Sequence, residues 1–133
     1  IEDSISFLGL LDKPTLAEAY NAGEIFVITS TAETQSMVMM QAMACGLPIV
    51  GVKARGLSEY INKKNGFLIE PNDPKALAEK IILLLKDRAL RKNLGQGAHR
   101  FARNFSASAV ASEWELIYQK VINDYNQRNV YRP

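Results

Sequence analysis

The side chains that could do chemistry lie in one stretch, residues 29–50. Glu33 falls between a run typical of a buried strand, residues 24–29, and a helical run, roughly residues 36–45. The N-terminus of a helix presents unpaired backbone N–H groups and the positive end of the helix dipole, which together favour a phosphate. A carboxylate beside that phosphate can accept hydrogen bonds from sugar hydroxyls. The alternative is that Glu33 is an acid that only caps the helix.

Gln41 is the second candidate, eight residues after Glu33 and the only polar residue of the run 37–43. Two positions that are eight residues apart lie about 80° from each other around a helix. A polar group on an otherwise apolar helix needs a partner or a water molecule. Gln41 is therefore either a satisfied core side chain or a side chain that faces a ligand.

The elements that must position these residues follow an α/β order. Strands are predicted at residues 5–9, 24–29, 48–52 and 67–70. Helices are predicted at residues 14–22, 36–45, 57–61, 74–86, about 88–103 and about 107–124, the last with an apolar face of Trp114, Ile117, Tyr118 and Val121. This order predicts an α/β fold, a Rossmann-like open parallel sheet flanked by helices, with a ligand site at its carboxyl edge.

Composition limits the function classes. The chain has 133 residues, 47% of them hydrophobic and 23% charged, which is ordinary for a globular domain. A net charge of +2 does not argue for nucleic acid, and one cysteine excludes an internal disulfide framework. Because residue 1 is not methionine, we expect an N-terminally truncated fragment of a larger protein. Its domain would span residues 1–125, followed by a polar tail at 126–133.

Residues 30–50 resemble the donor-binding signature of the retaining GT-B glycosyltransferases of family GT4. That signature is a Ser, a Glu, seven residues, a second Glu and then Ala-Met-Ala-x-Gly-x-Pro-Val-Val. The corresponding residues here are Ser30, Glu33, Gln41 and Ala-Met-Ala-Cys-Gly-Leu-Pro-Ile-Val at 42–50. The resemblance extends over nearly the whole chain, in the family's order and spacing. It implies the C-terminal, donor-binding half of a GT-B enzyme.

The resemblance also implies the donor-binding residues, which are Thr29, Ser30, Glu33, Ser36, Met37, Val38 and Gln41. Glu33 would hydrogen-bond hydroxyls of the donor sugar. The backbone N–H groups at 36–38 would bind the donor diphosphate. The side chain at 41 would contact the ribose hydroxyls, and Thr29 and Ser30 would line the floor of the cleft.

The implied reaction is transfer of a hexose from a UDP-, GDP- or ADP-hexose to an acceptor, with retention of anomeric configuration. The nucleotide sugar is a substrate, and no metal or cofactor is expected. The implied partner is the protein's own N-terminal GT-B domain, and the fragment alone should be inactive. The expected location is cytoplasmic, with peripheral association of the full-length protein at the cytoplasmic face of the membrane.

Two departures from the family pattern leave alternatives open. At position 41 an amide replaces the usual carboxylate, so it offers one acceptor and one donor and carries no charge. Ser36 stands where the family usually has glycine. One alternative is therefore an inactive or regulatory nucleotide-sugar-binding module, and another is a GT-B type nucleotide-sugar epimerase, which the Ala-Met-Ala-x-Gly-x-Pro run disfavours.

Overall fold

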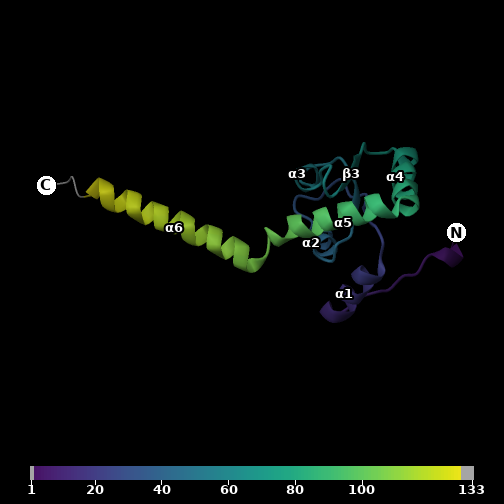
Figure 1. Cartoon of the computed structure of the whole chain (residues 1–133), viewed down its shortest axis with the longest axis horizontal. Helices are drawn as coiled ribbons and strands as arrows, with labels where there is room; N and C mark the ends of the chain where they lie inside the picture. The colour runs from purple at the N-terminus through teal and green to yellow at the C-terminus, as the bar shows by residue number, and fades with distance from the viewer. Residues whose placement is uncertain (1, 130–133) are drawn as a thin grey trace.

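A three-stranded parallel sheet forms the centre of the molecule, as the computed structural model of residues 2–129 shows (Figure 1). Its strands are β1 (Phe26–Ile28), β2 (Ile49–Val52) and β3 (Gly66–Ile69), in that order across the sheet. β2 lies in the middle, where Val50 is paired with Val27 on one side and Phe67 on the other. The predicted α/β class with an open parallel sheet is confirmed.

Helices cover both faces of this sheet. They are α1 (Lys13–Ala22), α2 (Met37–Ala44), α3 (Leu57–Tyr60), α4 (Pro74–Lys86), α5 (Arg88–Arg103) and α6 (Ala107–Asn129), preceded by a 3-10 turn, η1 (Glu2–Ser4). Neighbouring residues of β2 point to opposite faces: Ile49 packs in a core with α2, and Val50 packs in a core with α4. α5 borders both cores through Ala98 and Leu94.

Local chemistry sets where the helices begin and end. The Asp73 side chain accepts a hydrogen bond from the Ala76 N–H at 2.9 Å, and Pro74 occupies the first helical position of α4. α2 ends just before Gly46, whose φ of +81° is a left-handed conformation that glycine adopts without strain. These boundaries agree with the predicted ones.

The predicted strand at residues 5–9 does not form. Within residues 2–129 this segment pairs with no strand, and the side chains of Phe7 and Leu10 are 93% and 103% exposed. The physical reason is that a strand requires a neighbour to bond its backbone. In the described part of the chain, β1 pairs only with β2, and β3 pairs only with β2, so none of these strands bonds residues 5–9.

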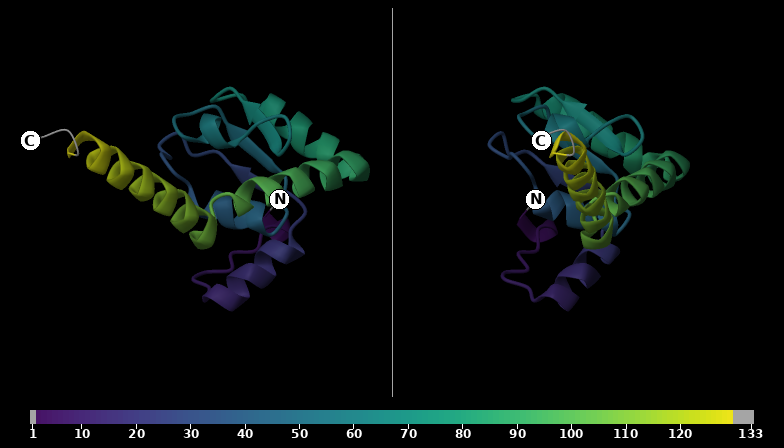
Figure 2. Two further views of the ribbon diagram at one scale, coloured as in Figure 1. Left: turned by 60° about the vertical axis from the view of Figure 1, so that its left-hand side comes forward. Right: turned by 90° about the vertical axis from the view of Figure 1, so that its left-hand side faces the viewer.

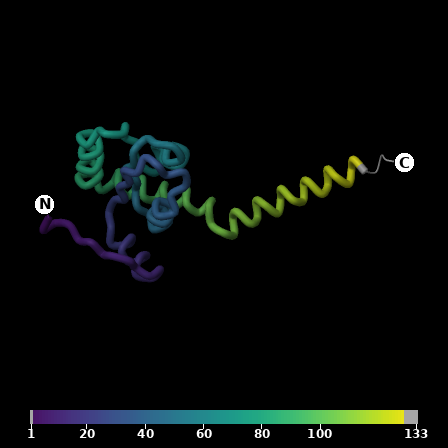
Figure 3. Tube along the Cα trace, turned by 180° about the vertical axis from the view of Figure 1, so that it is seen from behind, coloured from purple at the N-terminus to yellow at the C-terminus, as the bar shows by residue number. Residues whose placement is uncertain are grey.

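α6 extends away from the body of the molecule, with no other element beside it in any view of residues 2–129 (Figures 1, 2 and 3). Its predicted apolar face is present but lies in solvent, with Trp114 51% exposed. The helix continues to Asn129, beyond the predicted end at residue 124, so residues 126–129 of the predicted polar tail are helical. The rest of the predicted tail, 130–133, lies outside the described residues.

Candidate functional site

The loops that follow the three strands meet at the carboxyl edge of the sheet. They enclose a hollow of about 210 Å³. Its lining residues are Thr29, Thr31, Val52, Glu70, Pro71, Asn72, Asp73, Pro74 and Leu77. The predicted site residue Thr29 therefore lies at this edge, where open parallel sheets bind their ligands.

The loop between β1 and α2 carries Glu33, which is half-buried. Glu33 does not cap α2. The cap is Ser36, whose side chain is buried and accepts a hydrogen bond from the Met39 N–H at 3.4 Å. The interpretation of Glu33 as a capping acid is thus wrong, because the helix begins three residues later than that role requires. Ser30, also on this loop, accepts a hydrogen bond from the Ala32 N–H at 3.4 Å.

Three consecutive backbone N–H groups at the start of α2 have no acceptor. Met40 donates to the Ser36 carbonyl and Met39 to the Ser36 hydroxyl, but among residues 2–129 the N–H groups of Ser36, Met37 and Val38 donate to nothing. The side chains of Met37 and Val38 are exposed, so solvent reaches this end of the helix. Free N–H groups at the positive end of a helix dipole are suited to bind an anion.

Gln41 lies on a different surface from Thr29. It is exposed, so the interpretation of Gln41 as a satisfied core side chain is wrong. Its Oε1 accepts a hydrogen bond from the Tyr20 hydroxyl at 3.5 Å. Burial, together with the neighbouring Cys45, raises the pKa of Tyr20. The exposed Gln41 amide thus has two N–H donors and a remaining lone pair on Oε1 with which it can bind a ligand.

A second hollow, about 260 Å³ in volume, surrounds Gln41 between α1 and α2. Its lining residues are Lys13, Leu16, Ala17, Tyr20, Gln41, Ala44 and Cys45. No residue lines both this hollow and the one at the carboxyl edge. Thr29 and Gln41 therefore line different hollows in this structure.

The cationic side chains near the carboxyl edge differ in whether they already form an ion pair. The Lys53 ammonium forms an ion pair with Glu70 at 2.8 Å, and this hydrogen bond raises the pKa of Lys53. Arg55 forms no ion pair within residues 2–129, and its backbone has a φ of +35°. His99 is far from this edge, with Nδ1 2.6 Å from the Ala44 carbonyl oxygen at the other end of α2.

The part of the edge that follows β3 was not predicted to belong to the site. Asn72 and Asp73 line the hollow of Thr29, but no site residue was predicted there. The sequence did contain a signal for these residues, because ligands of open parallel sheets bind beyond the carboxyl ends of the strands, and Asn72 and Asp73 follow such a strand. Gly56 was also missed: its N–H donates to the Glu33 carbonyl at 3.2 Å. No sequence signal identifies that contact, because it joins two loops that are distant in the chain.

Comparison with solved structures identifies the class of this fold. Sucrose-phosphate synthase from Thermosynechococcus elongatus superposes with a TM-score of 0.80 and 31% identity, over 92% of this chain and 31% of that one. The Anabaena protein HepE, in a crystal structure with UDP-glucose, superposes with a TM-score of 0.78 and 27% identity, over 90% of this chain and 33% of that one. The fold is that of the GT-B glycosyltransferases.

Sequence comparison identifies the family. The family described as "Glycosyl transferases group 1" matches residues 1–101, and the chain belongs to it. N-acetyl-alpha-D-glucosaminyl L-malate synthase of Bacillus anthracis is 34% identical over 126 residues, which are 93% of this chain and 32% of that protein. Sulfoquinovosyl transferase of Arabidopsis thaliana is 32% identical over 89% of this chain and 22% of that protein. The chain thus spans about a third or less of the length of these relatives.

Proposed function

We propose that the full-length protein transfers a hexose from a nucleotide sugar to an acceptor with retention of configuration, and that this chain forms part of its donor site. The observation that carries the proposal is the row of free N–H groups at Ser36, Met37 and Val38, three residues after Glu33. A diphosphate can accept hydrogen bonds from all three groups. The UDP-glucose bound in the structure of the relative HepE supports a donor of this kind.

In this proposal the chain acts by positioning and electrostatic stabilisation. The N–H groups at 36–38 and the dipole of α2 stabilise the negative charge that develops on the departing diphosphate. The Glu33 carboxylate accepts hydrogen bonds from hydroxyls of the donor sugar and so fixes the orientation of the sugar. The Gln41 amide donates to the ribose from the side of α2 that faces α1. The acceptor site belongs to the N-terminal domain, outside this chain.

The test is nucleotide release by the full-length protein from a panel of UDP-, GDP- and ADP-hexoses, with crude lipid and sugar acceptors. We expect release from one donor and its loss in Glu33→Ala. Glu18→Ala, an exposed acid on α1, is the matched control and should retain activity. Release that survives Glu33→Ala, or no release and no binding of any donor, would contradict the proposal.

The amide at position 41 favours one second candidate, an inactive or regulatory module that binds nucleotide sugars. Gln41→Glu separates the two, since it restores a charged acceptor to an exposed site beside Tyr20. A weakened enzyme should gain turnover with this variant. A regulatory module should bind donor and show no turnover with either residue.

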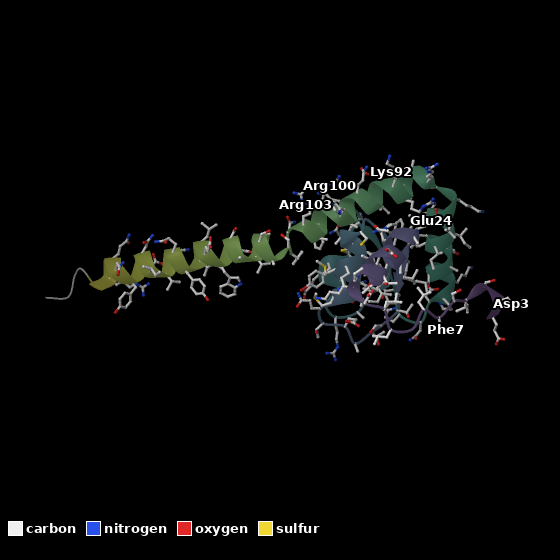
Figure 4. All side chains as sticks on the ribbon, turned by 90° about the horizontal axis from the view of Figure 1, so that it is seen from below. Asp3, Phe7, Glu24, Lys92, Arg100 and Arg103 are labelled. Carbon is white, nitrogen blue, oxygen red and sulfur yellow. The ribbon has the colours of Figure 1, made fainter. Side chains whose placement is uncertain are left out.

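We further propose that the full-length protein binds peripherally to anionic membrane surfaces through α5. This helix contains five of the sixteen Lys and Arg residues and none of the fourteen Asp and Glu residues. Arg91 is engaged by Glu24 and by two carbonyl groups at the end of α4. The other four form a basic face, which consists of Arg88, Lys92, Arg100 and Arg103, all exposed. Figure 4 shows Lys92, Arg100 and Arg103 on the edge of the molecule away from Asp3 and Phe7.

This basic face predicts weak, salt-sensitive binding. Each Lys or Arg near an anionic bilayer contributes about 1 kcal/mol, so Lys92→Gln with Arg100→Gln should lower binding roughly 30-fold. The assay is co-sedimentation of the full-length protein with phosphatidylcholine vesicles with and without phosphatidylglycerol. Lys75→Gln with Lys86→Gln on α4 removes the same charge elsewhere, and equal loss with both pairs would contradict the assignment. No helix within residues 2–129 is long and apolar enough to cross a bilayer.

A further inference from the structure

Gly56 touches the backbone of the loop that carries Glu33. Its N–H donates to the Glu33 carbonyl at 3.2 Å, and its Cα lies directly against the Thr34 carbonyl. A Cβ at position 56 would overlap the Thr34 carbonyl oxygen, far inside van der Waals contact. Only glycine leaves room for this approach.

The requirement for glycine here is one of space. Gly56 has a φ of −62° and a ψ of −24°, an ordinary helical conformation that any residue adopts. The unusual backbone is that of Arg55, immediately before it, with a φ of +35°. A left-handed conformation costs about 1–2 kcal/mol for a residue with a side chain. The loop after β2 thus retains an unfavourable conformation next to a residue that must be small.

The contact with Gly56 is what joins the Glu33 loop to the rest of the molecule. Within residues 2–129, the only other hydrogen bond of residues 31–35 is donated by the Ala32 N–H to the Ser30 hydroxyl, which belongs to the same loop. Ser36 bonds only within the first turn of α2. The hydrogen bond from Gly56 therefore fixes the loop, midway between strand and helix, to the loop after β2.

We infer that Gly56 is a positioning residue for Glu33. Gly56 leaves space for the Thr34 carbonyl and donates a hydrogen bond to the Glu33 carbonyl, and these two contacts set the position of the Glu33 carboxylate relative to the donor sugar. This inference rests on the proposed function. Gly56 itself touches no substrate, and its effect passes through the backbone of residues 33 and 34.

The test is Gly56→Ala in the full-length protein. The added methyl group must push the Thr34 carbonyl away by more than an ångström, and a misplacement of about 1 Å already lowers kcat by about 100-fold. The KM for the donor should change much less, because the N–H groups at 36–38 that hold the diphosphate begin beyond the displaced residues. A merely structural role would lower the folded fraction and leave the kcat of the folded enzyme unchanged.

Gly97→Ala is the matched control. Gly97 is also buried, and a Cβ there would overlap a backbone carbonyl oxygen in the same way, that of Lys64. It lies on α5 beside the turn before β3, at the opposite edge of the sheet from Glu33. Both variants should lose stability, measured by urea unfolding, but only Gly56→Ala should lose kcat once activity is divided by the folded fraction. Equal kcat in the two variants would overturn the inference.

Glu33→Gln provides the second arm, and it separates the failure of the inference from the failure of the proposed function. If Glu33→Gln leaves transfer unchanged, the proposed function fails. If Glu33→Gln impairs transfer, then Gly56→Ala in that background should cost less than about threefold, since its effect passes through Glu33. A full 100-fold further loss would overturn the inference.

Hydrogen exchange in the unaltered protein covers the case in which Gly56→Ala does not fold. The Gly56 amide should exchange as slowly as the amides of α3, because it is bonded to the Glu33 carbonyl. Exchange at the rate of an unbonded loop amide would overturn the inference.

Discussion

Removal of the hydroxyl of Ser36 should destabilise the chain through the loss of one helix cap. Ser36 is 1% exposed, and its Oγ accepts a hydrogen bond from the N–H of Met39, a residue that is 0% exposed. Loss of a Ser cap costs about 1 kcal/mol, and a buried N–H left without an acceptor costs about 1–3 kcal/mol. These two energies are alternative values for the loss of the same hydrogen bond, so they are not added together. Because this bond is long, at 3.4 Å, we expect Ser36→Ala to lower the free energy of unfolding by about 1.5 kcal/mol.

The assay is urea unfolding of the 133-residue chain, followed by far-UV circular dichroism. With a slope of about 1.5 kcal/mol per molar urea, the midpoint should fall by roughly 1 M. Ser36→Thr is the control, because threonine keeps a hydroxyl that can accept from the Met39 N–H and is also a favoured N-cap. A change below about 0.3 kcal/mol in Ser36→Ala would refute the assignment of Ser36 as the cap. An equal loss in both variants would also refute it, because the threonine variant retains the capping acceptor.

Three further predictions concern stability. Leu84→Ala should lower the free energy of unfolding by about 3 kcal/mol, because Leu84 is fully buried in the core beneath α4. A loss below about 1 kcal/mol, measured by urea unfolding, would contradict that packing. Gly46→Ala should cost about 1–2 kcal/mol from its φ of +81° alone, since the space around it is open; no measurable loss would mean that α2 ends differently. The ion pair with Glu70 raises the pKa of Lys53 in the folded protein above its unfolded-state value of 10.5. The ion pair should therefore stabilise the fold below pH 10.5, and this stabilisation should be lost as the pH rises through the folded-state pKa of Lys53. Urea midpoints between pH 7 and pH 11 should show this alkaline decline in the wild type, and Lys53→Met should reduce it.

Elements whose boundaries depend on local chemistry could be predicted from the sequence. α4 begins at Pro74 because the Asp73 carboxylate accepts from an N–H of the first turn, and both residues are visible in the sequence. α2 ends before Gly46 for an equally local reason, its left-handed backbone. The donor-site hypothesis had the same basis, since a carboxylate next to a helix start is a feature of neighbouring residues.

Features that depend on distant neighbours could not be predicted. Residues 5–9 have the composition of a strand, but pairing requires an adjacent strand, which none of β1–β3 provides. Gln41 lies on an apolar helix, and whether it is buried depends on how α1 and α5 cover α2. The contact of Gly56 with Thr34 joins loops that follow two different strands. In each case the missing information is the packing of one element against another.

The protruding α6 determines what fluorescence can measure in this chain. Trp114 is the only tryptophan, and it lies half-exposed on α6, where its ring contacts Tyr118 of the same helix at a centroid distance of 5.7 Å. Its emission therefore reports the helix–coil equilibrium of an isolated segment, which changes gradually with temperature, and does not report the cooperative loss of the sheet. A melting curve followed by tryptophan fluorescence would therefore report the unfolding of α6 and would not detect the unfolding of the sheet and the helices packed on it. Conversely, any molecule that covers this side of α6 would shift the emission to shorter wavelength without any change in the core.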